Sequence, residues 1–396
     1  MFVEMAHGTL QQALPSASGK LLQLLEKASF TSHSDKSTRI VSLQGKTNTV
    51  IGSTDDLNAP EPSPVISKSQ WALLKKYELQ TVTLSILDFD PLELARQFTL
   101  IESKIFCQIR PDELLDCEFN KCASTSKAVN VKAMSKLSTD LANLVADTIL
   151  QHTEPKKRAA VVKQWVKIAK KCRELNNYDS LVAILCSLNS SMISRLKKTW
   201  DLVPAKTIAR LDQLRPIGEG RMTLLRKLLE NHGAPCIPFV GLTLTDLTMN
   251  HEANAKTRKL GRSAGSSGLM GPSVEKNIIN FDRYFRTARS IGDLQRFQVG
   301  YNLKPVPAMQ AWMRSQIERV HIDKDASAAA YYRRSVWLEP RDPPPQQSQP
   351  NSASSANTSF SSVSSGGDRP LLSAKQSFWK SLGLPQGMHS KDEVSA

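Results

Sequence analysis

The stretch DFDPLELARQFTLIESKIF, Asp88–Phe106, decides the fold class. Asp90 can accept a hydrogen bond at the start of a helix, Pro91 suits the first helical position, and Glu93 stands where a capping-box carboxylate belongs. The sequence therefore predicts a helix that begins at Pro91 with a capping box. Apolar residues then recur every three or four positions and predict one buried stripe along this helix: Leu94, Phe98, Ile101 and Ile105.

The same helical spacing continues along the chain. One apolar stripe consists of Leu137, Leu141, Leu144 and Val145, and another of Val162, Trp165, Val166, Ala169 and Cys172. The segment 181–188 is apolar on nearly all sides, which is typical of a central helix. Because the alternation typical of strands is almost absent, we expect a single large all-α domain of roughly ten helices.

Both ends of the chain differ from this middle part. Residues 1–80 are mostly polar and short on periodicity, which predicts a flexible lead-in without a second helical module. The stretch from Asp342 to Pro370 is rich in Pro, Gln and Ser, so residues 342–396 are expected to be a disordered tail. The folded domain is predicted to occupy residues 81–341.

Composition restricts the class of protein. The chain has 396 residues, 40% of them hydrophobic, which suffices for a sizeable core. Its longest apolar stretches are far shorter than the roughly 20 residues that cross a bilayer, and it does not start like a secretory signal. Six cysteines in mostly apolar helical contexts suit reduced thiols, and we expect a cytoplasmic protein. Cys117 and Cys122 lack a second Cys/His pair at zinc-ligand spacing, so no metal site is predicted.

The net charge of +15 favours contact with something acidic. Basic clusters such as Lys156–Arg158 and Lys197–Lys198 lie beside helical patterns, where a solvated helix face is the favoured interpretation. Nucleic acid is not the expected partner, because the basic residues are spread out and the aromatic content is only 6%, without a recognisable base-stacking platform.

Two short motifs suggest enzyme chemistry, and both fail on context. GRSAG, Gly261–Gly265, fits the pattern of a nucleophile elbow around Ser263, but its flanks have loop composition instead of a strand and a helix. GKT, Gly45–Thr47, lacks the earlier glycine of a phosphate-binding loop, because Ile40 stands in that place. We therefore expect no bond-breaking enzyme and no cofactor site.

Several long segments, in order, resemble the catalytic domain of Ras-type guanine-nucleotide exchange factors (RasGEFs), in particular the fungal and Ras/Rap type. The resemblance covers about Leu84 to Arg341 and implies an all-α domain with a protruding helical hairpin. It also implies that the domain binds a Ras-family small GTPase and displaces its GDP and Mg²⁺, so that GTP can bind, with no cofactor of its own. The matching segments are DPLELARQFTLIESKIFCQIRPDELL, LNNYDSLVAILCSLNSSMISRLKKTW, PCIPFVGLTLTDLTMNHEAN, INFDRYFRTA and YYRRSVWLEPRD.

The resemblance also implies the site. The segment Phe239–Glu252 is similar to the first arm of the hairpin, and Lys276–Arg296 is similar to the second. Glu252 matches a carboxylate that competes with phosphate for the lysine and donors of the GTPase's phosphate-binding loop. Thr248 matches the side chain that crowds the magnesium site, and its spacing from Glu252 places both on one helix face.

Other positions are assigned by the same resemblance. Arg96, Asn176 and Asn177 match residues that organise and contact the switch surface of the GTPase, with internal capping or core hydrogen bonds as the alternative. Phe239 matches an aromatic at the hairpin base, where it serves packing as much as contact, and Asn250 is assigned to GTPase binding. Supporting roles for the hairpin are implied for Asn280, Phe281 and Arg195, the first two as its anchor to the core.

Some features depart from the family pattern. Met192 replaces the usual proline, the connection Ala255–Val274 is long and rich in Gly and Ser, and no upstream bracing module is evident. Two hypotheses follow: an active exchange factor, recruited to membranes that carry its GTPase, or a weak or inactive GTPase-binding scaffold. Peripheral contact with anionic lipid is expected through basic faces near Lys156 or Lys197. The sequence does not choose between Ras and Rap relatives as partners.

Overall fold

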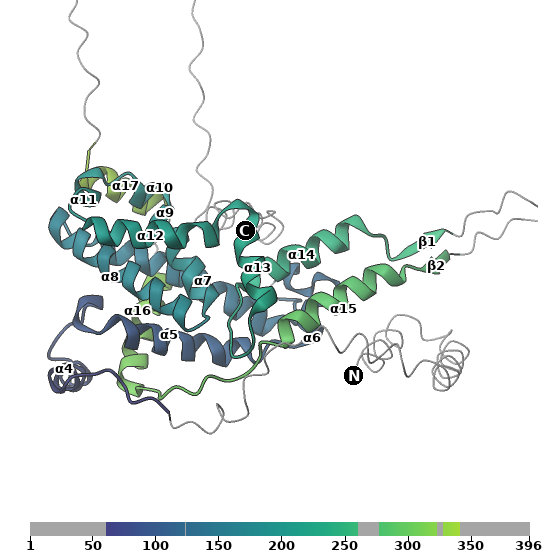
Figure 1. Ribbon diagram of the computed structural model, residues 1–396, viewed down its shortest axis with the longest axis horizontal. Coiled ribbons are helices and arrows are strands. Elements are labelled where there is room, and N and C mark those ends of the chain that lie inside the picture. Colours follow the sequence, from purple (N-terminus) through teal and green to yellow (C-terminus); the bar gives the residue numbers. More distant parts are fainter. Residues whose placement is uncertain (1–60, 123, 260–276, 323–327, 341–396) are drawn as a thin grey trace, which may run out of the picture.

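The computed structural model describes residues 61–122, 124–259, 277–322 and 328–340. Within them the fold is all-α, as predicted, with one helical hairpin projecting from the body (Figure 1). The motifs around Ser263 and Gly45 and the predicted tail 342–396 lie outside the described residues. Among the described helices, none has the length and apolar content that a membrane crossing requires.

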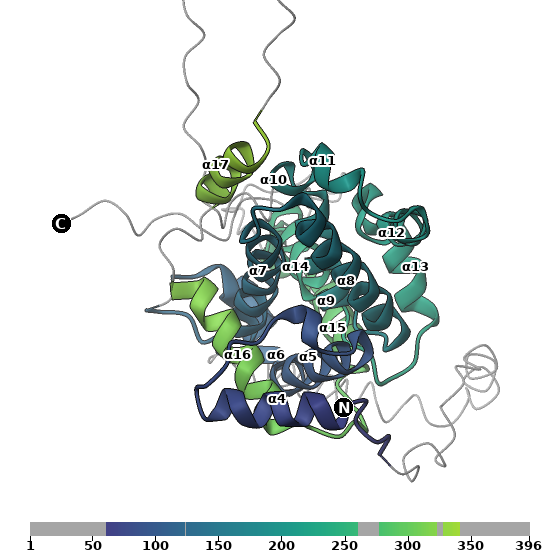
Figure 2. The same ribbon diagram turned by 90° about the vertical axis from the view of Figure 1, so that its left-hand side faces the viewer.

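Four long helices pack together at the centre of the body, and Figure 2 shows them between a lower and an upper group of helices. Every side chain from Leu181 to Leu185 is buried, which confirms the predicted central helix. Trp165 is fully buried and its indole N–H donates to Thr148 Oγ1 at 2.9 Å. The four are α5 (Pro91–Phe106), α7 (Val129–Leu150), α8 (Pro155–Glu174) and α9 (Tyr178–Asn189).

The start of α5 is predicted correctly except for its capping box. Asp90 Oδ1 accepts the backbone N–H of Leu92 at 2.8 Å, and the helix begins at Pro91. Glu93, however, is buried, and its carboxylate accepts from the Val65 backbone N–H at 2.8 Å and from Gln97 Nε2 at 2.6 Å. The inward turn lets Glu93 satisfy a donor from a distant segment, which local sequence spacing does not reveal.

The lower group includes a helix within the predicted N-terminal lead-in. This helix, α4 (Lys68–Glu78), has a complete capping box between Ser67 and Gln70, and it buries Leu74. It packs on α16, where Tyr77 Oη donates to Ser315 Oγ at 3.4 Å. The other elements of this part are η2 (Ile86–Asp88), α6 (Pro111–Leu114), η3 (Leu115–Asn120) and α16 (Pro307–Ile322).

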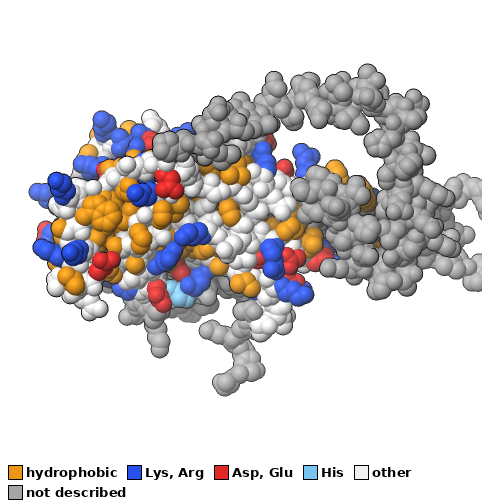
Figure 3. All heavy atoms as spheres, turned by 90° about the horizontal axis from the view of Figure 1, so that it is seen from below, with side chains coloured by type: hydrophobic (Ala, Val, Ile, Leu, Met, Phe, Trp, Pro, Cys, Tyr) orange, Lys and Arg blue, Asp and Glu red, His pale blue; other side chains and the backbone are white. Residues whose placement is uncertain are grey.

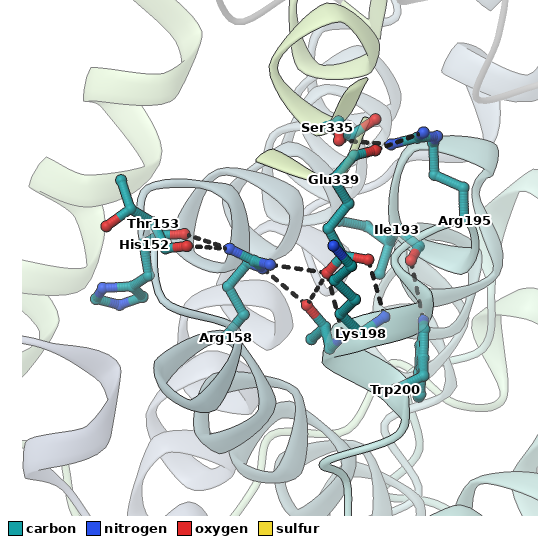
Figure 4. Close-up of polar contacts among 10 residues, drawn as sticks. His152, Thr153, Arg158, Ile193, Arg195, Lys198, Trp200, Ser335 and Glu339 are labelled. Carbon is teal, nitrogen blue, oxygen red and sulfur yellow. Dashed lines mark hydrogen bonds and ion pairs between the residues drawn. The ribbon is translucent and has the colours of Figure 1, made fainter. Parts of the chain in front are cut away.

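At the end of the upper group, Arg158 and Thr199 surround the carboxylate of Glu339, and this cluster is called the clasp (Figure 4). Glu339, just past the end of the last helix, pairs with the fully buried Arg158 at 2.7 Å and accepts the Thr199 hydroxyl at 2.7 Å. Burial alone would raise the pKa of Glu339, but the hydrogen bonds from Thr199 and Arg158 bring it below its ordinary value. The helices here are α10 (Ser191–Ser194), α11 (Lys197–Trp200), α12 (Ala205–Gly218), η4 (Gly220–Met222), α13 (Thr223–Asn231) and α17 (Ala328–Leu338).

The hairpin itself consists of two helices extended by a short β-ribbon. The arms are α14 (Val240–Ala253) and α15 (Phe281–Gln295), close to the predicted arms. Beyond them, β1 (Thr257–Lys259) pairs antiparallel with β2 (Asn277–Ile279), so that Thr257 lies opposite Ile279. The ribbon was not predicted, because three residues per strand are too few for a recognisable alternation.

Candidate functional site: the helical hairpin

Side-chain hydrogen bonds hold the two arms of the hairpin together. Asn250 on α14 donates through Nδ2 to the Arg283 carbonyl and to the Thr287 hydroxyl of α15, both at 3.0 Å. Asn254 Nδ2 in turn donates to the carbonyl and the side-chain oxygen of Asn250, both at 3.1 Å. The structure therefore uses Asn250 to join the arms.

Arg283 closes the C-terminal end of α14. It is almost fully buried, and Nη1 donates to the carbonyls of His251 at 3.1 Å and Asn254 at 2.6 Å. Nη2 lies 2.5 Å from Nδ1 of His251, whose pKa is lowered by burial and then by the Arg283 charge. A neutral imidazole can accept this N–H, and a cation suits the negative end of the α14 dipole.

The position of Arg283 in the sequence carries one signal of its role. It occupies the third position of α15, in the first turn, where the helix dipole favours acidic residues and disfavours a cation. An arginine in that position indicates a specific partner elsewhere, and here the partner is the end of the opposite arm. Asp116 of η3 adds ion pairs to Arg283 at 3.6 Å and to Lys256 at 3.5 Å.

Asn280 joins the arms where the helices give way to the ribbon. Its Nδ2 donates to the Ala255 carbonyl at 2.9 Å, and its backbone N–H donates to the Lys256 carbonyl at 2.9 Å. The side chain is buried between the two arms. Its anchoring role is thus within the hairpin and not toward the core.

Thr248 and Glu252 lie one helical turn apart on α14, but η3 covers only the first. The Thr248 side chain is 8% exposed, donates to the Leu244 carbonyl at 2.9 Å and accepts from Asn120 Nδ2 at 3.4 Å. Glu252 is exposed, and within the part of the chain that the structure describes its carboxylate has no hydrogen-bond or ion-pair partner. A carboxylate in the last turn of a helix gains nothing from the helix dipole, so Glu252 remains available to an external cation or donor.

The comparisons with known proteins agree with this geometry. The profile described as RasGEF domain matches residues 93–285, which include both arms of the hairpin. The chain contains a RasGEF domain. It is 31% identical over 288 residues to Cell division control protein 25 of Candida albicans, covering 70% of this chain and 20% of that protein.

Two further relatives extend the comparison. Ras guanine nucleotide exchange factor A of Dictyostelium discoideum is 34% identical over 291 residues, covering 72% of this chain and 44% of that protein. Ras-specific guanine nucleotide-releasing factor 2 of Danio rerio is 31% identical over 255 residues, covering 64% of this chain and 19% of that protein. The chain therefore spans less than half the length of each of these three relatives.

The root of the RasGEF hairpin lies against the start of α9. Phe239 is 1% exposed and therefore packs in the core. Asn176 has a positive φ of 55°, and its carbonyl accepts the Ile237 N–H at 3.0 Å. Asn177 is fully buried and donates through Nδ2 to Glu102 at 2.6 Å and to Thr99 at 3.1 Å. The structure favours internal hydrogen bonding by Asn177 over contact with a GTPase, because its side chain is buried.

Three other predicted residues lie elsewhere or face another way. Arg96 is held by the Ser63 carbonyl at 3.1 Å and by Glu93 at 3.4 Å, with 15% of its side chain exposed. Arg195 donates to the carbonyls of Ser335 and Glu339, so it fastens α17 instead of supporting the hairpin (Figure 4). The prediction that Phe281 anchors the hairpin to the core is contradicted, because Phe281 is 67% exposed.

The RasGEF domain braces its hairpin on two further sides. Arg226 of α13 makes a bidentate ion pair with Asp246 of α14, at 2.6 and 2.7 Å. On the other side η3 contacts α14 through Asn120 and reaches Arg283 of α15 through Asp116. Among the described residues, no group of three or more His, Cys, Asp or Glu side chains is placed to hold a metal ion.

Proposed function

We propose that this chain is a guanine-nucleotide exchange factor that opens the nucleotide site of a Ras-family small GTPase with its helical hairpin. GDP would leave and GTP would take its place. The observation that carries the proposal is the exposed, unpartnered carboxylate of Glu252 on a hairpin whose arms are locked together. The names of the relatives, which include a Ras guanine nucleotide exchange factor, support it.

The mechanism requires a negative charge held in position. GTPases hold the phosphates of their nucleotide with a loop of backbone N–H groups, a lysine and Mg²⁺. A carboxylate brought to that loop competes with phosphate for the same donors, and nucleotide is released because the factor binds the empty GTPase better than the loaded one. Exchange of this kind breaks no covalent bond. We assign the competing charge to Glu252.

Thr248 has a smaller part in this proposal. Its side chain lies against Asn120 of η3, so crowding of the magnesium site by Thr248 would require η3 to move away. In the described conformation Thr248 instead fixes α14 on η3 and so sets where Glu252 projects. We therefore expect Glu252 to carry the larger share of the exchange activity.

The braces favour exchange over the alternative of a weak or inactive scaffold. The ion pair between Arg226 and Asp246 and the contacts of η3 hold α14 from within the RasGEF domain itself. A hairpin that is held from two sides keeps its orientation when it contacts a partner. Support from a second module is therefore not a requirement of the proposed mechanism.

The test is release of a fluorescent guanine nucleotide from a panel of Ras, Rap and Rho-type GTPases by the full chain. We expect release from one Ras-family member, and a rate about 10- to 100-fold lower for Glu252→Ala, the effect of losing one charge-assisted hydrogen bond. Glu230→Ala, which removes an exposed glutamate of α13, is the matched control and should behave like the wild type. Binding of a GTPase without any release would instead identify a scaffold.

We also propose that the domain contacts anionic membranes, where lipid-anchored GTPases reside. Beyond the predicted faces near Lys156 and Lys197, α4 exposes Lys68 and Lys75 beside Trp71, whose side chain is 46% exposed. Figure 3, which views the lower side that carries α4, shows hydrophobic side chains with Lys and Arg around them. Lysines attract anionic headgroups, and an exposed tryptophan suits the membrane interface.

Vesicle sedimentation tests this contact. We expect the chain to sediment with vesicles that contain phosphatidylserine and to remain in solution with neutral phosphatidylcholine vesicles. Replacing Trp71 and Lys75 together should weaken the binding, whereas replacing Lys227, an exposed lysine of α13, should not. Equal binding to both kinds of vesicle would contradict the electrostatic part of the proposal.

A further inference from the structure

The segment that leads into the hairpin helix α14 is joined to the start of α9. The backbone N–H of Tyr178 donates to the Ile237 carbonyl at 2.8 Å, and the Ile237 N–H donates to the Asn176 carbonyl at 3.0 Å. These two bonds form an isolated parallel bridge between residues 177 and 237. These hydrogen bonds to the start of α9 therefore fix the direction in which α14 projects from the body.

At this junction α14 lacks a cap of its own. The N-cap residue is Phe239, whose phenyl ring has no oxygen to accept an N–H from the first turn. Free N–H groups at a buried helix start are costly unless an acceptor is supplied. Asp179 of α9 supplies one, because its Oδ1 accepts the N–H of Val240, the first residue of α14, at 3.3 Å. The Asp179 side chain is 1% exposed.

The other carboxyl oxygen of Asp179 reaches α7. Oδ2 makes a short contact with the Ser138 hydroxyl, which also lies 3.0 Å from the Met134 carbonyl. The Ser138 hydroxyl donates to this oxygen, while the Met134 carbonyl lies inside α7, where the helix supplies a backbone N–H donor. One buried carboxyl group thus ties α7, α9 and α14 together.

A second buried carboxyl group, that of Glu102, interacts with Asp179. Burial raises the pKa of Asp179, and burial, followed by the charge of Asp179, raises the pKa of Glu102 on α5. The titratable group that faces this cluster from α8 is Cys172, whose pKa is also raised by burial. Glu102 accepts short hydrogen bonds from Asn177 and Ser180, both at 2.6 Å. Because the charge of Asp179 raises the pKa of Glu102, Asp179 is the carboxyl group of this pair that loses its proton first.

We propose that Asp179 is a positioning residue for nucleotide exchange: it caps the hairpin helix from a neighbouring helix and so fixes the direction in which Glu252 is presented. The proposal rests on the exchange function proposed above. Asp179 does not touch the GTPase, since it is buried behind Val240. Its effect on the reaction passes entirely through the orientation of α14.

Asparagine and alanine at this position separate the proposal from a general role in stability. Asp179→Asn keeps an oxygen for the Val240 N–H, and its amide can donate to Ser138 when that hydroxyl donates to the Met134 carbonyl, so we expect release within about twofold of the wild type. Asp179→Ala removes the cap, and we expect the maximal release rate to fall about tenfold, at an unchanged half-saturating GTPase concentration. Ser187→Ala on the same helix, whose buried hydroxyl has no partner among the described residues, is the control expected to leave release unchanged.

Amide hydrogen exchange reports on the start of the hairpin independently of nucleotide release. In Asp179→Ala the amides of the first turn of α14 should lose protection, while those of α8 keep theirs; in Asp179→Asn both should match the wild type. An alanine variant with wild-type release and protection overturns the proposal, as does an asparagine variant that fails like alanine. If the wild type releases nucleotide from no GTPase, the exchange function fails, and the protection data still decide whether Asp179 caps α14.

A pH profile adds a readout that a merely structural role would not move. As the pH rises past neutrality, the buried carboxyl groups of Asp179 and Glu102 both lose their protons and repel each other. We expect the ratio of wild-type release to Asp179→Asn release to fall across that range, because asparagine does not titrate. A ratio that stays constant with pH contradicts this coupling between the two carboxyl groups.

Discussion

Glu339 and Glu252 occupy comparable positions at opposite ends of the described fold, yet their surroundings differ completely. Each carboxylate lies at the C-terminal end of a helix, α17 or α14, where the helix dipole disfavours a negative charge. Glu339 is buried and accepts from Arg158, Thr199 and the backbone of Lys198. Glu252 is exposed and has no partner within the described residues. The first charge is compensated internally and stabilises the fold, while the second is exposed, as the proposed exchange function requires.

The largest expected effect comes from breaking the compensated site. Glu339→Gln leaves Arg158 as a buried charge without its counter-ion, which costs about 3–5 kcal/mol of unfolding free energy. We expect a clear fall in the thermal midpoint, measured by circular dichroism, with nucleotide release preserved at temperatures where the variant is folded. Glu318→Gln, at an exposed glutamate of α16, is the control. A midpoint equal to that of the wild type would mean that the clasp contributes no stability.

Acid should produce part of the same effect in the wild type. The pKa of Glu339 lies below its ordinary value in the folded state, so the folded protein binds this proton less readily than the unfolded chain does. The stability it contributes is present above the unfolded pKa and is lost as the pH falls through the folded pKa. The gap in unfolding free energy between wild type and Glu339→Gln should therefore narrow as the pH falls below about 4, the usual range of a glutamate. A constant gap would contradict the charged clasp.

The next effect concerns the hairpin alone. Arg283→Met removes the donors to the carbonyls at the end of α14, and hydrogen bonds from a charged group are worth about 1.5–3 kcal/mol. We expect the last turn of α14 to lose protection from hydrogen exchange by roughly 30-fold, the factor for about 2 kcal/mol, while the thermal midpoint changes little. Arg286→Met, at an exposed arginine of the same helix, is the control. Loss of protection throughout the domain would show that Arg283 supports the core instead.

The same contrast explains which parts of the domain are predictable from sequence. The start of α5 at Asp90 and the burial of 181–185 depend on a local cap and local periodicity, and these predictions are confirmed. The two arms of the hairpin were implied by the family resemblance, and the structure has helices there. The predictions that failed depend on residues far apart in the chain. Glu93 turns toward Val65 instead of its own helix start, and Arg195 fastens α17, 140 residues further on.

The site follows the same rule. The exposed position of Glu252 on α14 agrees with what the family resemblance implied, whereas its role in exchange remains a prediction. The groups that hold it in place were not predicted, because Arg283 and Asp179 each act on a helix other than their own. Asn177 was weighed for a surface and an internal role, and nothing in the local pattern distinguishes an asparagine that donates to a buried Glu102 from one that faces a partner.

The smallest expected effect tests the brace from α13. The ion pair between Arg226 and Asp246 has side chains that are 41% and 36% exposed, so solvent screening limits its contribution to stability to about 0.5 kcal/mol. Arg226→Gln should leave the thermal midpoint almost unchanged and lower nucleotide release only about twofold. Exchanging the charges, with Arg226→Asp and Asp246→Arg together, should recover what either change alone loses. If Arg226→Gln instead abolishes release while the protein remains folded, α13 is the principal support of the hairpin. The position of Glu252 would then depend on the ion pair between Arg226 and Asp246.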